Sequence, residues 1–106
     1  MSTVDDSSHW QGMEDPATGM AVLSGEIDFS NSPAVRDWLR VFCHVHTGPV
    51  VLDLSAVQYI DSSGLAILIE IRKHLKAEAR SIRISAVSDQ VRRLFSLTQI
   101  GDLFGI

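Results

Sequence analysis

Short apolar runs alternate with amphipathic segments along most of this chain, and this alternation constrains the fold more than any other feature. Residues 50–54 are short, rich in β-branched side chains and mostly apolar, which predicts a central strand buried on both faces. Residues 32–46 and 62–79 carry apolar side chains at helical spacing, so each segment predicts a helix. Strands that alternate with helices favour parallel pairing and helices packed on the sheet. The predicted fold class is therefore α/β, with a mixed β-sheet in a single domain.

The remaining elements are shorter and are predicted from turn and capping residues. Short apolar or alternating segments predict further strands at residues 9–13, 20–24, 81–85 and 103–106. A turn at residues 15–19 joins the first two strands into a hairpin, because it contains Pro16 and Gly19. If Ser32 caps the first long helix, Pro33 falls at its first helical position. A third helix is predicted to begin at residues 88–89.

Size, charge and cysteine content exclude several classes of protein. The chain has 106 residues, with 9 Lys and Arg against 13 Asp and Glu, so it suits one domain and is not a basic nucleic-acid binder. Residues 1–8 are mostly polar and predict a disordered tail, which leaves residues 9–106 for the domain. Cys43 has no partner for an internal disulfide. There is no secretory signal and no apolar run approaching ~20 residues, so we expect a cytoplasmic protein that does not span a membrane.

The most informative segment is the one in which the predicted central strand leads into a loop and then an apolar helix. That loop contains Asp61, Ser62, Ser63 and Gly64. Ligands gather at the carboxyl ends of parallel strands, and the free N–H groups of a helix N-terminus attract phosphate. A serine there can be a phosphoryl acceptor, or it can simply cap the helix, and the residue types alone favour the cap.

Four segments together resemble the STAS domains of anti-sigma factor antagonists, also called anti-anti-sigma factors. They occur in the order and at about the spacing of that family: residues 25–28, 51–54, 59–65 and 91–95. Each segment alone is a weak signal, whereas all four together are specific. The resemblance implies a STAS-like mixed β-sheet with helices packed against it.

The same resemblance implies a regulatory role that depends on Ser62. In the family, the serine directly after the aspartate accepts the phosphoryl group. The unmodified protein binds an anti-sigma factor that is also an ATP-dependent serine kinase, and phosphorylation releases the antagonist. A metal-dependent Ser/Thr phosphatase then resets the cycle. ATP and the metal belong to these partners, so the resemblance implies a non-enzymatic protein that needs no cofactor of its own.

Other residues near Ser62 are candidates for binding the partner. Asp28 and Asp61 are expected to orient the hydroxyl or to contact basic groups of the kinase, although Asp28 can equally cap the turn before the first helix. Ser63 and Gly64 are expected to shape the loop, and glycine allows a partner's backbone to approach closely.

Three alternatives compete with this interpretation. A serine hydrolase is disfavoured because the chain lacks a G-x-S-x-G elbow. A metal site at residues 43–46 is disfavoured because His44 and His46 point about 200° apart on a helix. The third alternative keeps the fold and makes the chain a STAS subunit of a transport or signalling complex, which would bind a partner without the release cycle.

Overall fold

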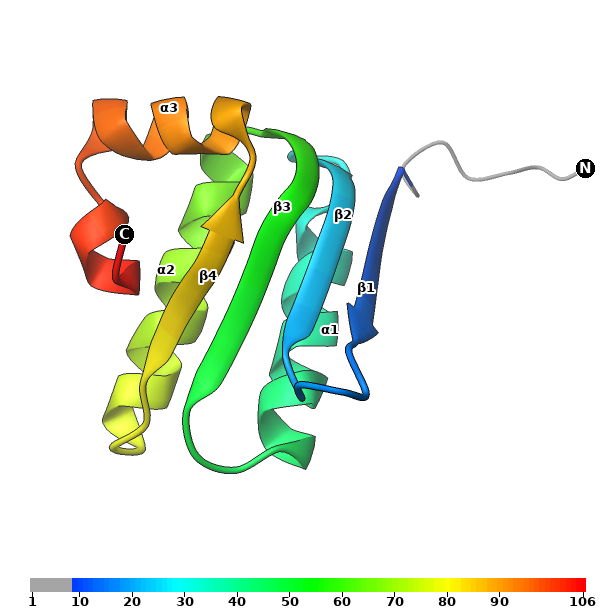
Figure 1. Cartoon of the computed structure of the whole chain (residues 1–106), viewed down its shortest axis with the longest axis vertical. Coiled ribbons are helices and arrows are strands. Elements are labelled where there is room, and N and C mark those ends of the chain that lie inside the picture. Colours follow the sequence, from blue (N-terminus) through cyan, green and yellow to red (C-terminus); the bar gives the residue numbers. More distant parts are fainter. Residues whose placement is uncertain (1–8) are drawn as a thin grey trace, which may run out of the picture.

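The computed structural model describes residues 9–106, so the tail predicted at residues 1–8 lies outside the described residues (Figure 1). Within residues 9–106, four strands form one sheet in the order β1-β2-β3-β4. Their bounds are β1 Trp10–Glu14, β2 Ala21–Ile27, β3 Val50–Ile60 and β4 Ile82–Val87. Strand β1 pairs antiparallel with β2, whereas β2, β3 and β4 are mutually parallel, which confirms the predicted mixed sheet.

Three α-helices follow the parallel strands in the described part of the chain. They are α1 Ser32–Val45, α2 Ser62–Ala77 and α3 Asp89–Thr98. Helices α1 and α2 cover one face of the sheet, and α3 lies across the end toward which β4 points (Figure 1). Right-handed crossovers that always step in the same direction along a sheet place their helices on the same face. No helix in residues 9–106 is long and apolar enough to cross a membrane.

Burial of β3 on both faces, which the apolar run predicted, is wrong. Leu52 and Leu54 are fully buried beneath the helices, whereas Val51 and Asp53, which alternate with them along the strand, are only half-buried. The reason is that α1 and α2 share one face, so the alternate side chains of β3 point to the less covered face. The core therefore lies in a single layer between the sheet and these helices.

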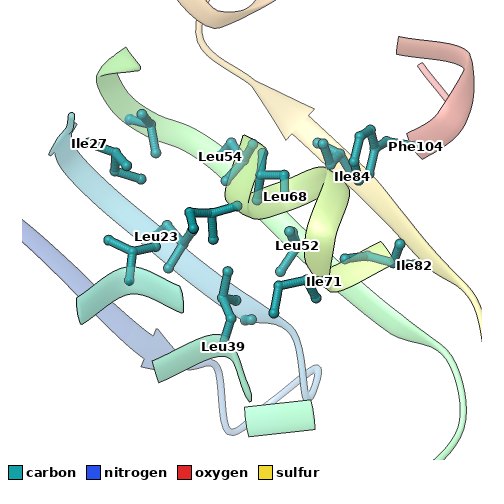
Figure 2. Close-up of a cluster of buried hydrophobic side chains, with 14 of the residues drawn as sticks. Leu23, Ile27, Leu39, Leu52, Leu54, Leu68, Ile71, Ile82, Ile84 and Phe104 are labelled. Carbon is teal, nitrogen blue, oxygen red and sulfur yellow. The ribbon is translucent and has the colours of Figure 1, made fainter. Parts of the chain in front are cut away.

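The core unites side chains from both layers. Figure 2 shows Leu23 from β2, Leu52 and Leu54 from β3, and Leu39, Leu68 and Ile71 from the two helices gathered in one cluster. The aliphatic positions that predicted the helices and strands are the positions that meet here, which is why the predicted elements and the observed ones agree.

Strand β3 runs to Ile60, six residues beyond the predicted end. Its ladder with β4 stops at Leu54, so the last part of β3 pairs with β2 only. On the side of β3 that faces β4, side chains from the start of α3 form hydrogen bonds with the backbone of this last part. Ser88 Oγ donates to Val57 O at 2.6 Å, and Ile60 N donates to Gln90 Oε1 at 3.3 Å. The long strand carries the next loop beyond the sheet, where it is accessible.

The last strand, predicted at residues 103–106, is wrong, because a 3₁₀ helix, η1 Gly101–Phe104, forms instead. Local hydrogen bonds close the turn, including Ile106 N to Gly101 O at 3.0 Å. Gly105 has a φ of +79°, a conformation that interrupts a strand and that glycine adopts without strain. The turn also buries Phe104, whose ring centroid lies 6.0 Å from that of Phe95.

Helix α1 begins at Ser32, the predicted first residue, but the suggested capping role of Ser32 is wrong. Asn31 occupies the cap position without a side-chain capping hydrogen bond. At the other end, the Arg80 guanidinium donates to the carbonyl oxygens of Cys43 at 2.8 Å, His46 at 2.5 Å and Gly48 at 3.0 Å. Arg80 thereby satisfies carbonyl groups that the end of α1 leaves without helical partners.

Candidate functional site

Two loops meet at the carboxyl ends of β2 and β3, and the side chain of Asp61 joins them. Ile27 pairs with Ile60 at the end of the ladder, and Asp61 N donates to Ile27 O at 3.2 Å. Asp61 Oδ1 accepts from the backbone N–H groups of Ser63 at 2.8 Å and Gly64 at 3.2 Å, so Asp61 is the N-cap of α2. Its other oxygen, Oδ2, accepts from Phe29 N at 3.2 Å in the neighbouring loop.

Ser62 is the first residue of α2, and its side chain is exposed. Because Asp61 caps the helix, the alternative in which Ser62 or Ser63 is merely the cap is wrong. Within residues 9–106, no hydrogen bond involves the Ser62 hydroxyl. The oxygen is therefore available to another molecule at a position where the free N–H groups of the helix favour negative charge.

The neighbouring loop, residues 28–31, is held by a local network of hydrogen bonds. Asp28 Oδ1 accepts from Ser30 N at 2.9 Å and from Ser30 Oγ at 2.5 Å. Buried Asn31 accepts from Asp28 N at 3.0 Å and donates to Glu26 O at 2.8 Å. The hydrogen bonds from the Ser30 hydroxyl and then the Ser30 N–H hold the pKa of the Asp28 carboxyl below its usual value. The Asp28 carboxylate thus stabilises the turn before α1, as the capping alternative proposed.

Gly64 is buried and faces the domain's own core. A Cβ at this position would clash with Ile60 Cγ1 and lie 3.0 Å from Ile27 Cγ2. The absence of a side chain therefore lets the first turn of α2 pack directly on the ends of β2 and β3. The predicted contact between Gly64 and a partner stays a prediction, as do the partner contacts of Asp28, Asp61 and Ser63.

Sequence reasoning did not identify Phe29 or Asn31 as residues of the site. Phe29 lies in the Asp28–Asn31 turn, and its side chain is 77% exposed. It is a single apolar residue among polar ones, so no periodicity distinguishes it. Asn31 lies in a run of three residues that are all common helix caps, and nothing in that run indicates which of them is buried.

Comparison with known proteins identifies the family. The chain matches the sequence model of the STAS domain over residues 13–106. It belongs to the STAS domain family. An anti-sigma-B factor antagonist of Listeria monocytogenes is 34% identical to this STAS domain over 85 residues, which cover 79% of this chain and 74% of the relative. Its counterpart in Staphylococcus aureus is 30% identical over 84 residues, which cover 79% of this chain and 78% of the relative.

Solved structures agree with this assignment. The crystal structure of an anti-sigma factor antagonist from Mycobacterium paratuberculosis has a TM-score of 0.77 and is 28% identical, covering 97% of this chain and 88% of that chain. The fold predicted from the family resemblance, a STAS-like mixed sheet with helices packed on it, is therefore confirmed.

The segment that raised a possible metal site has other contacts in this STAS domain. Cys43 is buried, and burial raises the pKa of its thiol. His46 Nε2 lies 3.1 Å from Glu14 Oε1, and the His46 ring packs on Phe42 with centroids 4.3 Å apart. Within residues 9–106, no three His, Cys, Asp or Glu side chains form a group that could hold a metal ion.

Replacing Asp61 by alanine should destabilise this STAS domain by about 2 kcal/mol, because both the helix cap and the bond to the neighbouring loop are lost. An Asp61→Asn variant is the matched control, since asparagine keeps one oxygen that can cap α2 and should lose less than half as much stability. Urea denaturation of the two variants and the wild type measures these differences. A loss below about 0.5 kcal/mol for Asp61→Ala would show that the carboxylate does not hold the two loops together.

Proposed function

We propose that this protein is an anti-sigma factor antagonist that binds an anti-sigma factor with serine kinase activity and is released when Ser62 is phosphorylated. The observation that supports this best is the Ser62 hydroxyl at the start of α2, which is exposed and makes no hydrogen bond within residues 9–106. The named relatives support the same role, because those from Listeria monocytogenes and Staphylococcus aureus are anti-sigma-B factor antagonists.

The position of Ser62 suits a residue that alternates between a neutral and a charged form. A phosphoserine carries about −1.5 to −2 charges at pH 7. At the first position of a helix this charge gains about 0.3–1 kcal/mol from the helix dipole, while the neighbouring Asp61 carboxylate opposes it. We therefore expect little structural change within the domain on phosphorylation, and the main effect falls on the partner.

The proposed cycle requires two further activities that other proteins supply. The anti-sigma factor provides ATP and its metal ion for phosphoryl transfer, and a Ser/Thr phosphatase removes the phosphoryl group from Ser62. Ser63 and Gly64 contribute by shaping the loop that the kinase reaches. Asp28 and Asp61 position the Ser62 hydroxyl or contact basic groups of the kinase. If Asp28→Ala and Asp61→Ala variants were both phosphorylated and bound as the wild type is, that role would be excluded.

Incubation with a purified anti-sigma factor kinase and ATP, followed by mass spectrometry, tests the acceptor residue. The wild type should gain one phosphoryl group, and a Ser62→Ala variant should gain none. Ser81→Ala is the control and should still gain one phosphoryl group, because Ser81 is exposed just before β4, at the end of the sheet opposite to Ser62. A phosphoryl gain that survives Ser62→Ala would move the site elsewhere. Recovery of a transporter instead of an anti-sigma factor in a pull-down would favour the transport-complex alternative.

A further inference from the structure

Phe29 is a large apolar side chain that the fold does not use. It is 77% exposed, although a phenylalanine commonly buries most of its surface, and the nearest core residue in sequence, Ile27, is buried. A single exposed apolar side chain is common on protein surfaces and has no meaning by itself. At Phe29 it coincides with two other features, a fixed backbone and a contact with Asp61, the residue before Ser62.

The backbone that carries Phe29 is fixed from both sides. Its own N–H donates to Asp61 Oδ2 at 3.2 Å. Asp28 and Ser30, the residues before and after it, are bonded to each other, and Asn31 holds the turn to Glu26 O at 2.8 Å. A side chain on a backbone that is already ordered loses less conformational entropy when it is buried in an interface. Anchors of this kind contribute much of the binding energy at protein interfaces.

The location of Phe29 determines which molecule covers it. A specific interface buries about 800 Å² and roughly 20–30 residues on each partner. Any kinase that reaches the Ser62 hydroxyl must cover the surface around Asp61, which is the residue before Ser62 and is bonded to Phe29 N. Phe29 therefore falls inside the footprint of that kinase.

The charges around Phe29 indicate the chemistry of the opposing surface. Residues 26–31 and 61–64, which contain the two loops, include the carboxylates Glu26, Asp28 and Asp61 but no Lys or Arg. Two basic residues lie next to these loops: His9, whose charge helps to lower the pKa of Asp28, and Arg36, which is paired with Asp37. A complementary surface would be apolar at its centre and basic at its border.

From these observations we propose that Phe29 is the main apolar anchor for the anti-sigma factor kinase, and that it inserts into an apolar pocket bordered by basic residues on that partner. This inference rests on the proposed function and adds the residue that provides most of the affinity. Ser62 reports the phosphorylation state, whereas Phe29 holds the unmodified protein in the complex.

Calorimetry with unphosphorylated variants tests the inference. The partner is the host's anti-sigma factor kinase, which is selected because it phosphorylates the wild type at Ser62. Phe29→Ala should weaken binding by about 30-fold or more, and Phe29→Leu, which keeps much of the apolar surface, should weaken it by less than about tenfold. Val45→Ala is the control. Val45 is 67% exposed at the far end of α1, roughly 20 Å along the helix, and its loss should leave affinity unchanged.

The outcomes separate the two proposals. If Phe29→Ala binds within about twofold of the wild type while phosphorylation of Ser62 still abolishes binding, Phe29 is not the anchor and the antagonist function stands. If no anti-sigma factor kinase of the host binds or phosphorylates the wild type, the proposed function fails and this inference fails with it. Thermal unfolding of Phe29→Ala should match that of the wild type, since the side chain is mostly exposed.

Discussion

A Ser62→Asp variant should bind the anti-sigma factor about a thousandfold more weakly than the wild type. The partner surface that receives a small neutral hydroxyl would have to bury a carboxylate. The basic residues proposed for the border of that surface already face Glu26, Asp28 and Asp61, so the added charge has no counter-charge of its own, which costs several kcal/mol. A loss of about 4 kcal/mol corresponds to roughly three orders of magnitude in affinity. Phosphorylated wild type, which carries more charge, should bind no better than the variant. Calorimetry or surface plasmon resonance with the purified partner measures both.

The control for this experiment is Ser81→Asp. Ser81 is exposed just before β4, at the end of the sheet opposite to Ser62, so the added charge is the same and the location differs. Its affinity should equal that of the wild type. Both variants should keep the wild-type circular dichroism spectrum, because each replaces an exposed side chain. Tight binding by a folded Ser62→Asp variant would contradict release by charge.

A Phe104→Ala variant should lose about 3–5 kcal/mol of folding free energy, the largest stability effect that we expect. Phe104 is completely buried and packs against Phe95 of α3. Removing the ring leaves a cavity at the point where η1 closes one end of the core. Urea denaturation followed by circular dichroism gives the free energy of unfolding.

Leu103→Ala is the matched control for Phe104→Ala. Leu103 is the preceding residue of η1 but is 37% exposed, and its carbonyl oxygen, which accepts from Arg72 Nε at 3.0 Å, is retained in the variant. Loss of the Leu103 side chain should lower the free energy of unfolding by less than about 1 kcal/mol. Equal, small losses for both variants would mean that η1 does not pack on the domain in solution.

The helices and strands were predictable wherever apolar periodicity identifies a buried face. The stripe of Val35, Leu39 and Phe42 gave α1 almost its full length, and all three side chains are buried. Strand β3 was predicted too short because Ser55 and Gln58, on its exposed side, interrupt the apolar run. A strand that is buried on one face has few consecutive apolar residues, so an apolar run underestimates the length of the strand.

The prediction of a final strand failed for a different reason. Leu103, Phe104 and Ile106 are equally compatible with a strand and with a turn that buries one of them. The burial of Phe104 against Phe95 is a tertiary contact, and local sequence does not contain it. The same limit applies to Phe29, whose exposure depends on how the turn is held by Asp61.

Apart from Phe29 and Asn31, the residues of the candidate site were predictable from the sequence, but the role of each residue was not. Asp61, Ser62 and Ser63 are all common capping residues, so sequence alone could not assign the cap. Asp61 takes that role because it has an extended backbone, with φ −108° and ψ −173°, from which its carboxylate reaches the N–H groups of Ser63 and Gly64. Because Asp61 caps the helix, the Ser62 hydroxyl makes no hydrogen bond to the part of the chain that the structure describes.

The parallel arrangement of β2, β3 and β4 separates the two ends of the sheet. The loops before α1, α2 and α3 share one end, while the β1–β2 turn and the connections into β3 and β4 share the other (Figure 1). A fluorophore attached in the β1–β2 turn, for instance at exposed Ala17, would therefore sit a full strand length away from the loop of Ser62. Such a label would report complex formation through slower tumbling without occupying the surface that the partner needs.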